Sequence, residues 1–144
     1  MSDVQDYWQN YINGAWVDGG AGRIAVSNPG TGAHLADCAL ADAADVDRAV
    51  AAAKAMHDSN VLSDLRPVER SRMVQGMGAF LLANKEEIAR VLTLEQGKPY
   101  WESIIEVEGA ARYFEYYGNQ GETVEGRSIP LGAGYYDFTT YEPF

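Results

Sequence analysis

Few residues of this chain could do chemistry on their own, because its 144 residues include one cysteine and two histidines. Cys38 has a nucleophilic side chain, but neither a basic residue nor a helix start lies beside it to lower the thiol pKa. We therefore expect Cys38 to be a small buried strand residue. His34 and His57 fall in different predicted elements, so a zinc site would have to recruit carboxylates.

The glycine-rich stretches do not match known cofactor motifs. Residues 132–134 (Gly-Ala-Gly) are followed by Tyr135, not by the third glycine and the helix of a dinucleotide fingerprint. Gly97 lacks the upstream glycine of a P-loop, and Pro99 stands where that loop has serine or threonine. The G-x-S-x-G signature of a nucleophile elbow is also absent from the sequence. The sequence therefore predicts neither a catalytic residue nor a cofactor-binding residue in these 144 positions.

Composition narrows the class of protein. Hydrophobic residues make up 47% of the chain and charged residues 22%, which is typical of a globular protein. The net charge of −10 would repel phosphate backbones, so we expect no nucleic-acid partner. No apolar run approaches the roughly 20 residues that span a bilayer, so we expect no membrane partner. The polar start and the single cysteine favour a cytoplasmic location.

The first forty residues carry strand and turn signals. Asn13 and Gly14 sit between short runs of strand-forming residues within 11–17, which predicts a β-hairpin with a type I′ turn. Residues 24–28 and 33–40 read as two further strands joined by an Asn-Pro-Gly turn. These segments predict a small antiparallel sheet.

Four helices are expected after residue 41. Their start signals are Asp42, Pro67, Asn84 and Pro99. Asp42 caps a first helix that ends near Asp58, and Asn84 forms a capping box with Glu87. Gly97 ends the third helix, and the fourth and longest runs from Tyr100 to about residue 117.

The fourth helix raises three expectations about side chains. Glu108 and Arg112 have the spacing of an i,i+4 ion pair. Gly109 lies in mid-helix, where it either allows another element to pack closely or leaves room for a ligand, and we favour packing. Aromatic residues at helical spacing are typical of a core, and this applies to Trp101, Tyr113, Tyr116 and Tyr117.

The last residues predict a second β-hairpin. It begins at Arg127, turns at residues 132–134 and ends at Tyr141. An isolated two-stranded ribbon is marginal in water, and its edges present unpaired backbone groups. We therefore expect it to have a partner, which is a later part of the chain, another subunit, or both.

The order of motifs resembles the N-terminal part of the NAD(P)-dependent aldehyde dehydrogenase superfamily. The motifs are YINGAWV (11–17), VSNPGTGAHLA (26–36), ADVDRAVAAAKAM (44–56), RPVERSRMV (66–74), LTLEQGKP (92–99), RSIPL (127–131) and YEPF (141–144). The resemblance implies an α/β, Rossmann-like parent enzyme. Its portion in this chain would be mixed α and β, with N-terminal antiparallel strands, four helices and a C-terminal β-hairpin.

The resemblance also implies a division of the chain and a set of partners. Residues 1–126 would belong to the N-terminal part of the cofactor-binding domain, and residues 127–144 to an oligomerisation hairpin. The hairpin from Arg127 to Tyr141 would join subunits of a homo-oligomer, a dimer or a tetramer. The remainder of the enzyme would be the other partner.

An enzyme of this family would oxidise an aldehyde to a carboxylic acid with NAD or NADP. Its nucleophilic cysteine, general base and cofactor-binding glycines would lie beyond Phe144, so we expect the 144-residue chain alone to be inactive and to bind no cofactor. By resemblance, Gly109 and Tyr113 would lie at the substrate entrance. Glu95 and the backbone carbonyl of Ser27 would hold a monovalent cation, although a solvated Glu95 is the simpler and favoured expectation.

A second function stays open at this point. The chain could be a non-catalytic interaction module that associates with a related enzyme through its C-terminal β-ribbon by strand addition.

Overall fold

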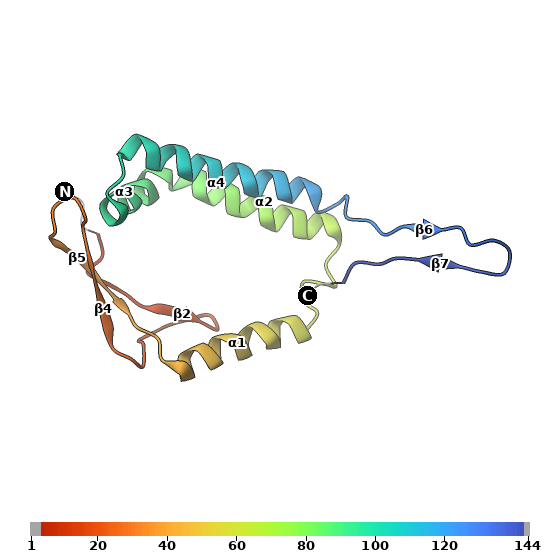
Figure 1. The fold of residues 1–144 in the computed structure, drawn as a ribbon, viewed down its shortest axis with the longest axis horizontal. Helices are drawn as coiled ribbons and strands as arrows, with labels where there is room; N and C mark the ends of the chain where they lie inside the picture. The colour runs from red at the N-terminus through yellow and green to blue at the C-terminus, as the bar shows by residue number, and fades with distance from the viewer. Residues whose placement is uncertain (1–3, 143–144) are drawn as a thin grey trace.

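The computed structural model describes residues 4–142, which form a small β region, four helices and a projecting hairpin (Figure 1). The elements are β1 (Tyr7–Trp8), β2 (Asn10–Ile12), β3 (Ala15–Val17), β4 (Arg23–Ser27), β5 (His34–Ala39), α1 (Ala43–Asp58), α2 (Pro67–Ala83), α3 (Lys85–Gln96), α4 (Tyr100–Gln120), β6 (Ser128–Ile129) and β7 (Asp137–Phe138). The mixed α and β composition predicted from the sequence is confirmed. None of the described helices is long and apolar enough to cross a bilayer.

The N-terminal strands form two small sheets. β2 and β3 pair antiparallel, and Asn13 (φ 51°) and Gly14 (φ 79°) occupy the positive-φ turn between them, as a type I′ turn requires. β4 pairs antiparallel with β5, and β1 joins the other edge of β5 in parallel. The antiparallel strands are confirmed. The parallel strand β1 was not predicted, because a strand of two residues is too short to show the alternation of apolar and polar side chains that identifies strands in a sequence.

Helix α1 begins at the predicted cap, and a buried carboxylate fixes that end. Asp42 Oδ1 accepts a hydrogen bond from the backbone N–H of Asp45 at 2.9 Å. Asp45 Oδ2 accepts from the N–H groups of Gly20 (2.7 Å) and Asp42 (3.0 Å), and the Asp45 side chain also pairs with Arg48. The Gly20 and Asp42 hydrogen bonds, in that order, lower the pKa of Asp45. Asp45 thus ties the helix start to the preceding glycine loop.

Helices α2 and α4 lie side by side and form most of the core (Figure 1). Their contact depends on small residues, because Ser71 and Gly78 of α2 and Ala111 of α4 are buried there. A Cβ on Gly78 would lie 2.9 Å from the Ala111 carbonyl oxygen and 3.2 Å from Phe114 Cβ. Gly78 therefore lets the two helices approach more closely than a larger residue would.

Helix α3 packs against α4 and ends as predicted. Ala89 is fully buried, and the hydroxyl oxygens of Thr93 and Ser103 lie 2.8 Å apart between the two helices. Gly97 has a φ of 73° and ends α3 in the left-handed conformation that favours glycine. That prediction is confirmed.

Two predicted side-chain interactions of the helices are wrong. Asn84 makes no capping box with Glu87; its Nδ2 donates to the Phe80 carbonyl at 2.8 Å, because Asn84 is also the residue that ends α2. Glu108 pairs with Lys85 Nζ at 2.7 Å instead of with Arg112, because packing of α3 on α4 brings the lysine to it. This hydrogen bond is the main cause that raises the pKa of Lys85. Helix α4 also continues to Gln120, beyond the expected end.

The C-terminal hairpin is confirmed, but it is paired over a short length. Only Ser128 with Phe138 and Ile129 with Asp137 are paired in register, so the connecting loop is longer than the predicted turn at 132–134. The hairpin extends away from the helices (Figure 1). The last two residues of the YEPF motif, Pro143 and Phe144, lie outside the described residues.

Candidate functional site

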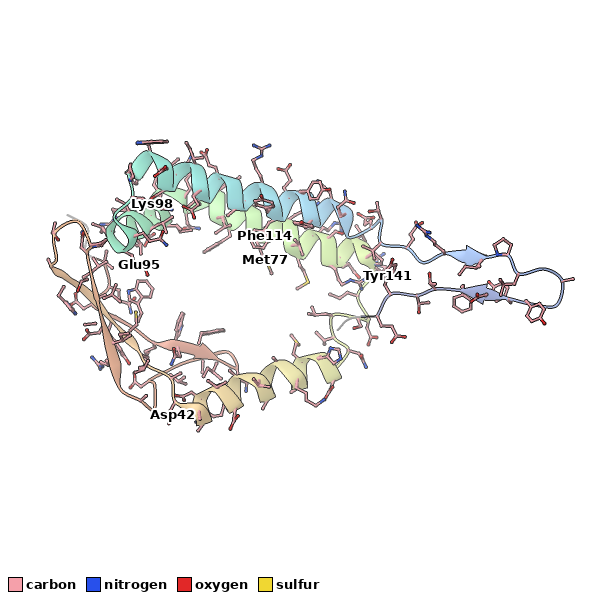
Figure 2. All side chains as sticks on the ribbon, viewed as in Figure 1. Asp42, Met77, Glu95, Lys98, Phe114 and Tyr141 are labelled. Carbon is pink, nitrogen blue, oxygen red and sulfur yellow. The ribbon has the colours of Figure 1, made fainter. Side chains whose placement is uncertain are left out.

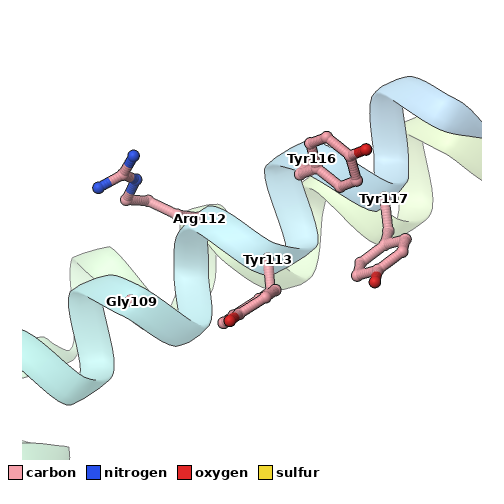
Figure 3. Close-up of a pocket in the computed structure, with 5 residues that line it drawn as sticks. All are labelled: Gly109, Arg112, Tyr113, Tyr116 and Tyr117. Carbon is pink, nitrogen blue, oxygen red and sulfur yellow. The ribbon is translucent and has the colours of Figure 1, made fainter.

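The two residues predicted for a substrate entrance lie at one hollow on α4 (Figure 3). The hollow has a volume of about 460 Å³ and is lined by Gly109, Arg112, Tyr113, Tyr116 and Tyr117. Tyr113 and Tyr117 lie nearly parallel, with ring centroids 6.5 Å apart and planes inclined by 16°. The edge of Tyr116 meets Tyr117, with centroids 5.2 Å apart. The arrangement offers flat aromatic faces to a small apolar molecule.

The expectation that the aromatic residues of α4 form a core is wrong for this chain. Tyr113, Tyr116, Tyr117 and Trp101 are between 58% and 68% exposed. The face of α4 that α2 and α3 cover carries small or β-branched residues instead: Ser103, Val107, Ala111 and Gly118. Helical spacing identified an apolar face but did not say which face the neighbouring helices cover.

Gly109 leaves space where we expected close packing. A Cβ built on Gly109 would meet no atom within 4 Å, so no element of the described chain packs against it. The packing expectation is therefore wrong here, and the alternative of room for a ligand fits the observed space. The glycines that do permit close packing of α2 and α4 are Gly78 and Gly118, and the sequence did not single out Gly78 from its neighbour Gly76.

Glu95 and Ser27, the predicted cation ligands, lie in the same part of the molecule. Glu95 lines a hollow of about 230 Å³ together with Val26, the residue before Ser27. The end of α3 also meets the turn after Ser27, since a Cβ on Gly97 would lie 2.8 Å from Pro29 Cγ. Both Glu95 and Ser27 are exposed.

The donor set near Glu95 restricts the kind of ion that could bind there. Residues 4–142 contain no group of three His, Cys, Asp or Glu side chains able to hold a metal ion. One carboxylate with backbone carbonyls suits a weakly held monovalent cation better than calcium or zinc, which require more or stronger ligands.

The three residues first considered for catalysis do not form a site. Cys38 is half-buried in β5, opposite Trp8 of β1, which is less burial than we expected. His34 Nε2 lies 2.9 Å from Asp37 Oδ1 in an exposed pair on the same strand. His57 lies in the last turn of α1.

Sequence reasoning missed a polar cluster that joins the N-terminal strands. Tyr7 Oη donates to Asp18 Oδ1 at 2.8 Å, and Gln9 Nε2 donates to the same oxygen at 3.0 Å. The Arg23 guanidinium lies 3.7 Å from the centre of the Tyr7 ring. The hydrogen bonds from Gln9 and Tyr7 lower the pKa of Asp18, and the Asp18 hydrogen bond raises the pKa of Tyr7. The cluster connects β1, the residue after β3 and the start of β4, and we interpret its role as structural.

Comparison with known proteins identifies the family to which the chain belongs. The Aldehyde dehydrogenase family profile matches residues 16–144, so the chain belongs to this family of oxidoreductases. The resemblance inferred from the motifs is thereby confirmed, and the chain corresponds to an N-terminal portion of such enzymes.

Individual relatives show how much of an enzyme the chain represents. Human retinal dehydrogenase 2 is 30% identical over 140 residues, which cover 95% of this chain and 27% of the relative. Aldehyde dehydrogenase family 2 member B4 of Arabidopsis thaliana is 34% identical over 137 residues, which cover 94% of this chain and 26% of that relative. The NAD⁺ complex of a Bacillus cereus aldehyde dehydrogenase superimposes on this chain with a TM-score of 0.91 at 27% identity. The match covers 95% of this chain and 28% of the Bacillus cereus enzyme. The chain thus spans about a quarter of the length of the proteins it matches.

Proposed function

We propose that the chain acts as the N-terminal portion of an enzyme that oxidises an aldehyde to a carboxylic acid with NAD. The observation that carries this proposal is the family match over residues 16–144. NAD is favoured because similar solved structures contain it, among them the Bacillus cereus enzyme; NADP is the alternative. NAD supplies the hydride acceptor for such an oxidation.

The chain's own part in this activity is structural. No glycine-rich dinucleotide motif is present in the sequence, so we assign no NAD ligand to these residues. We propose that residues 1–126 form the N-terminal part of the cofactor-binding domain and that the hairpin of residues 127–144 joins subunits of a homo-oligomer. The exposed aromatic side chains of the hairpin support this, since Tyr135, Tyr136 and Tyr141 are all more than 70% exposed. The single cysteine supports the proposal of a cytoplasmic enzyme.

A chimaera tests the activity and the substrate entrance together. This chain would replace the matching portion of the Bacillus cereus enzyme, and NAD reduction would be measured with acetaldehyde and with benzaldehyde. We expect both aldehydes to be oxidised. We expect Gly109→Leu to fill the hollow beside Tyr113 and to lower kcat/KM for benzaldehyde by roughly tenfold or more, with little change for acetaldehyde.

A matched control places leucine elsewhere on α4. Glu102 lies in the exposed first turn, outside the hollow, and Glu102→Leu should leave the ratio of the two kcat/KM values unchanged. Equal losses for both aldehydes in Gly109→Leu would argue against an entrance at this hollow. A folded chimaera that oxidises neither aldehyde would contradict the proposed function itself.

We further propose that Glu95 and the Ser27 carbonyl hold a monovalent cation in the folded enzyme. Their placement near the same hollow, with a single carboxylate, supports this proposal. We expect the chimaera to melt a few degrees higher in potassium chloride than in choline chloride at equal ionic strength, because a bound ligand stabilises the folded state. Glu95→Gln should abolish that difference, while Glu87→Gln, in the first turn of α3, should preserve it. An undiminished potassium effect in Glu95→Gln would exclude this carboxylate as a ligand.

A further inference from the structure

A further hollow lies on the N-terminal strands, and the proposed dehydrogenase activity uses none of its side chains. It has a volume of about 240 Å³ and is lined by Gln5, Trp8, Gln9 and Trp16. We call it the tryptophan hollow. Figure 2 shows the N-terminal strands separated by an open interval from helix α4, on which Phe114 is labelled. The tryptophan hollow is therefore distinct from the hollow on α4.

The four lining residues come from one short stretch of chain and the strand that pairs with it. Gln5 precedes β1, Trp8 ends β1, Gln9 links β1 to β2, and Trp16 is the middle residue of β3. Trp8 also lines the hollow that contains Glu95, whereas the other three residues do not. The volume is below the range that is typical of drug-sized ligands, so the tryptophan hollow suits a smaller molecule.

Two indole rings are open to solvent at this hollow. Trp8 is 40% exposed and Trp16 is 62% exposed. Tyr11 is the cross-strand partner of Trp16, and the centroids of the two rings lie 4.9 Å apart, which helps to hold the Trp16 ring in place. Neither indole N–H makes a hydrogen bond to another group of residues 4–142. Exposed aromatic rings at a concave surface are typical of binding sites.

The two glutamine side chains bring amide groups to the same hollow. Gln5 Nε2 donates a hydrogen bond to the Tyr7 carbonyl, and Gln9 Nε2 donates to Asp18 Oδ1 at 3.0 Å. These hydrogen bonds restrict the rotation of both amides. Each amide nitrogen still has a second N–H, and each amide oxygen accepts no hydrogen bond in the part of the chain that the structure describes. Both amides can therefore donate to a ligand and accept from it.

This combination of groups selects a neutral ligand that carries hydroxyl groups. The described side chains that line the hollow are all uncharged, so neither an anion nor a cation would meet an opposite charge there. The free amide oxygens need a donor and the free N–H groups need an acceptor, and a hydroxyl group supplies both. The indole faces favour contact with C–H groups. A pyranose sugar combines a face of C–H groups with a rim of hydroxyl groups.

We propose that the tryptophan hollow binds one pyranose ring of a neutral sugar. The C–H face of the sugar lies against an indole ring, and its hydroxyl groups exchange hydrogen bonds with the amides of Gln5 and Gln9. The hollow is open and offers few polar groups, so we expect a dissociation constant on the order of 1 mM. The proposal does not depend on the proposed function, because it rests only on the side chains of the N-terminal strands.

The indole N–H signals in NMR spectra test this proposal directly, because only two of the three tryptophans of the chain line the hollow. Titration of the 144-residue chain with methyl β-glucoside should shift the signals of Trp8 and Trp16 until they saturate. Trp101, on α4 and 63% exposed, is the internal control and should not shift. Sorbitol carries hydroxyl groups but has no ring, and it should shift none of the three signals.

Substitutions test the two kinds of contact separately. Trp16→Ala removes a ring face and Gln5→Ala removes an amide, and each should weaken the binding of methyl β-glucoside by about tenfold or more. Trp101→Ala is the matched control and should leave the affinity unchanged. Gln5 precedes the first strand, so Gln5→Ala should leave the fold intact even if Trp16→Ala disturbs the hairpin.

The Bacillus cereus chimaera tests whether the hollow stays open in the folded enzyme. Saturation-transfer NMR detects contact between a protein and a weakly bound ligand, and it should show contact with methyl β-glucoside that Trp16→Ala reduces. A chimaera in which Trp16→Ala leaves this signal unchanged would overturn the proposal for the enzyme. A chimaera that binds the sugar but reduces no NAD would sustain the proposal and contradict only the proposed function.

Other results of the titration would overturn the proposal. Equal shifts of all three tryptophans, or equal shifts with sorbitol, would show a general effect of the solvent. The absence of a saturable shift at Trp8 and Trp16 would exclude a sugar site, and so would an affinity that Gln5→Ala and Trp16→Ala leave unchanged. Saturable shifts with choline chloride but not with methyl β-glucoside would identify an aromatic site for a quaternary ammonium ion instead.

Discussion

Replacing Asp45 with alanine is expected to free the start of α1 and to lower the urea midpoint of the chain by on the order of 1 M. The substitution removes the acceptor of two backbone N–H groups, those of Gly20 and Asp42, at a position that is 1% exposed. Buried donors without an acceptor are strongly unfavourable. Circular dichroism during urea unfolding measures the effect. Asp47→Ala, at an exposed position of the same helix, is the matched control and should change the midpoint little.

The same carboxylate should make the stability of the chain depend on pH. Because the pKa of Asp45 is lower in the folded chain than in the unfolded one, its contribution is present above about pH 4 and is lost as the pH falls through the folded pKa. Asp45→Asn keeps one acceptor oxygen but cannot titrate, so its urea midpoint should fall less steeply over this range. An identical acid dependence in Asp45→Asn and in the unmodified chain would show that other carboxylates are responsible.

Adding one methyl group to α2 is expected to have opposite effects at two neighbouring glycines. Gly78→Ala should destabilise the chain by about 1–3 kcal/mol, because its Cβ would press on the Ala111 carbonyl oxygen, which cannot move without shifting α4. Gly76→Ala should stabilise it by about 0.5–1 kcal/mol, because its Cβ meets nothing and alanine favours the helix. Each variant is the control for the other, since both make the same substitution in one helix.

Urea unfolding of the two alanine variants decides between close packing and simple helix propensity. If both substitutions stabilise the chain equally, the contact between α2 and α4 is looser than the structure indicates. If both destabilise it, Gly76 must also meet a neighbour, such as a second copy of the chain.

Local signals predicted the backbone elements well. Asn13 and Gly14 need positive φ, Asp42 accepts the first free N–H of a helix, and Gly97 ends a helix in the left-handed region; each effect acts within a few residues. Asn84 shows where local signals fail. This one residue links α2 to α3, and its side chain donates a hydrogen bond to the Phe80 carbonyl at the end of α2 instead of capping α3. Asn84 carries two local signals, one for the end of α2 and one for the start of α3, and the sequence does not show which of them the side chain follows.

Contacts between distant segments were the main source of error. Glu108 has an acceptable local partner in Arg112, yet packing supplies Lys85, 23 residues away, at hydrogen-bond distance. The aromatic residues of α4 were expected in the core, but their face is not the one that α2 and α3 cover. A helical period identifies a face and cannot identify what lies opposite it.

By itself, the sequence determined the family, the order of the elements and most of their boundaries. Turns, helix caps and family motifs depend on residues that lie close together in the sequence, so they can be recognised without the tertiary structure. Only the tertiary structure decided that Gly78 allows close packing while Gly109 opens a hollow, and that Asp45 is buried. These features depend on the distance between segments far apart in the sequence, and that distance is set by the packing of whole helices.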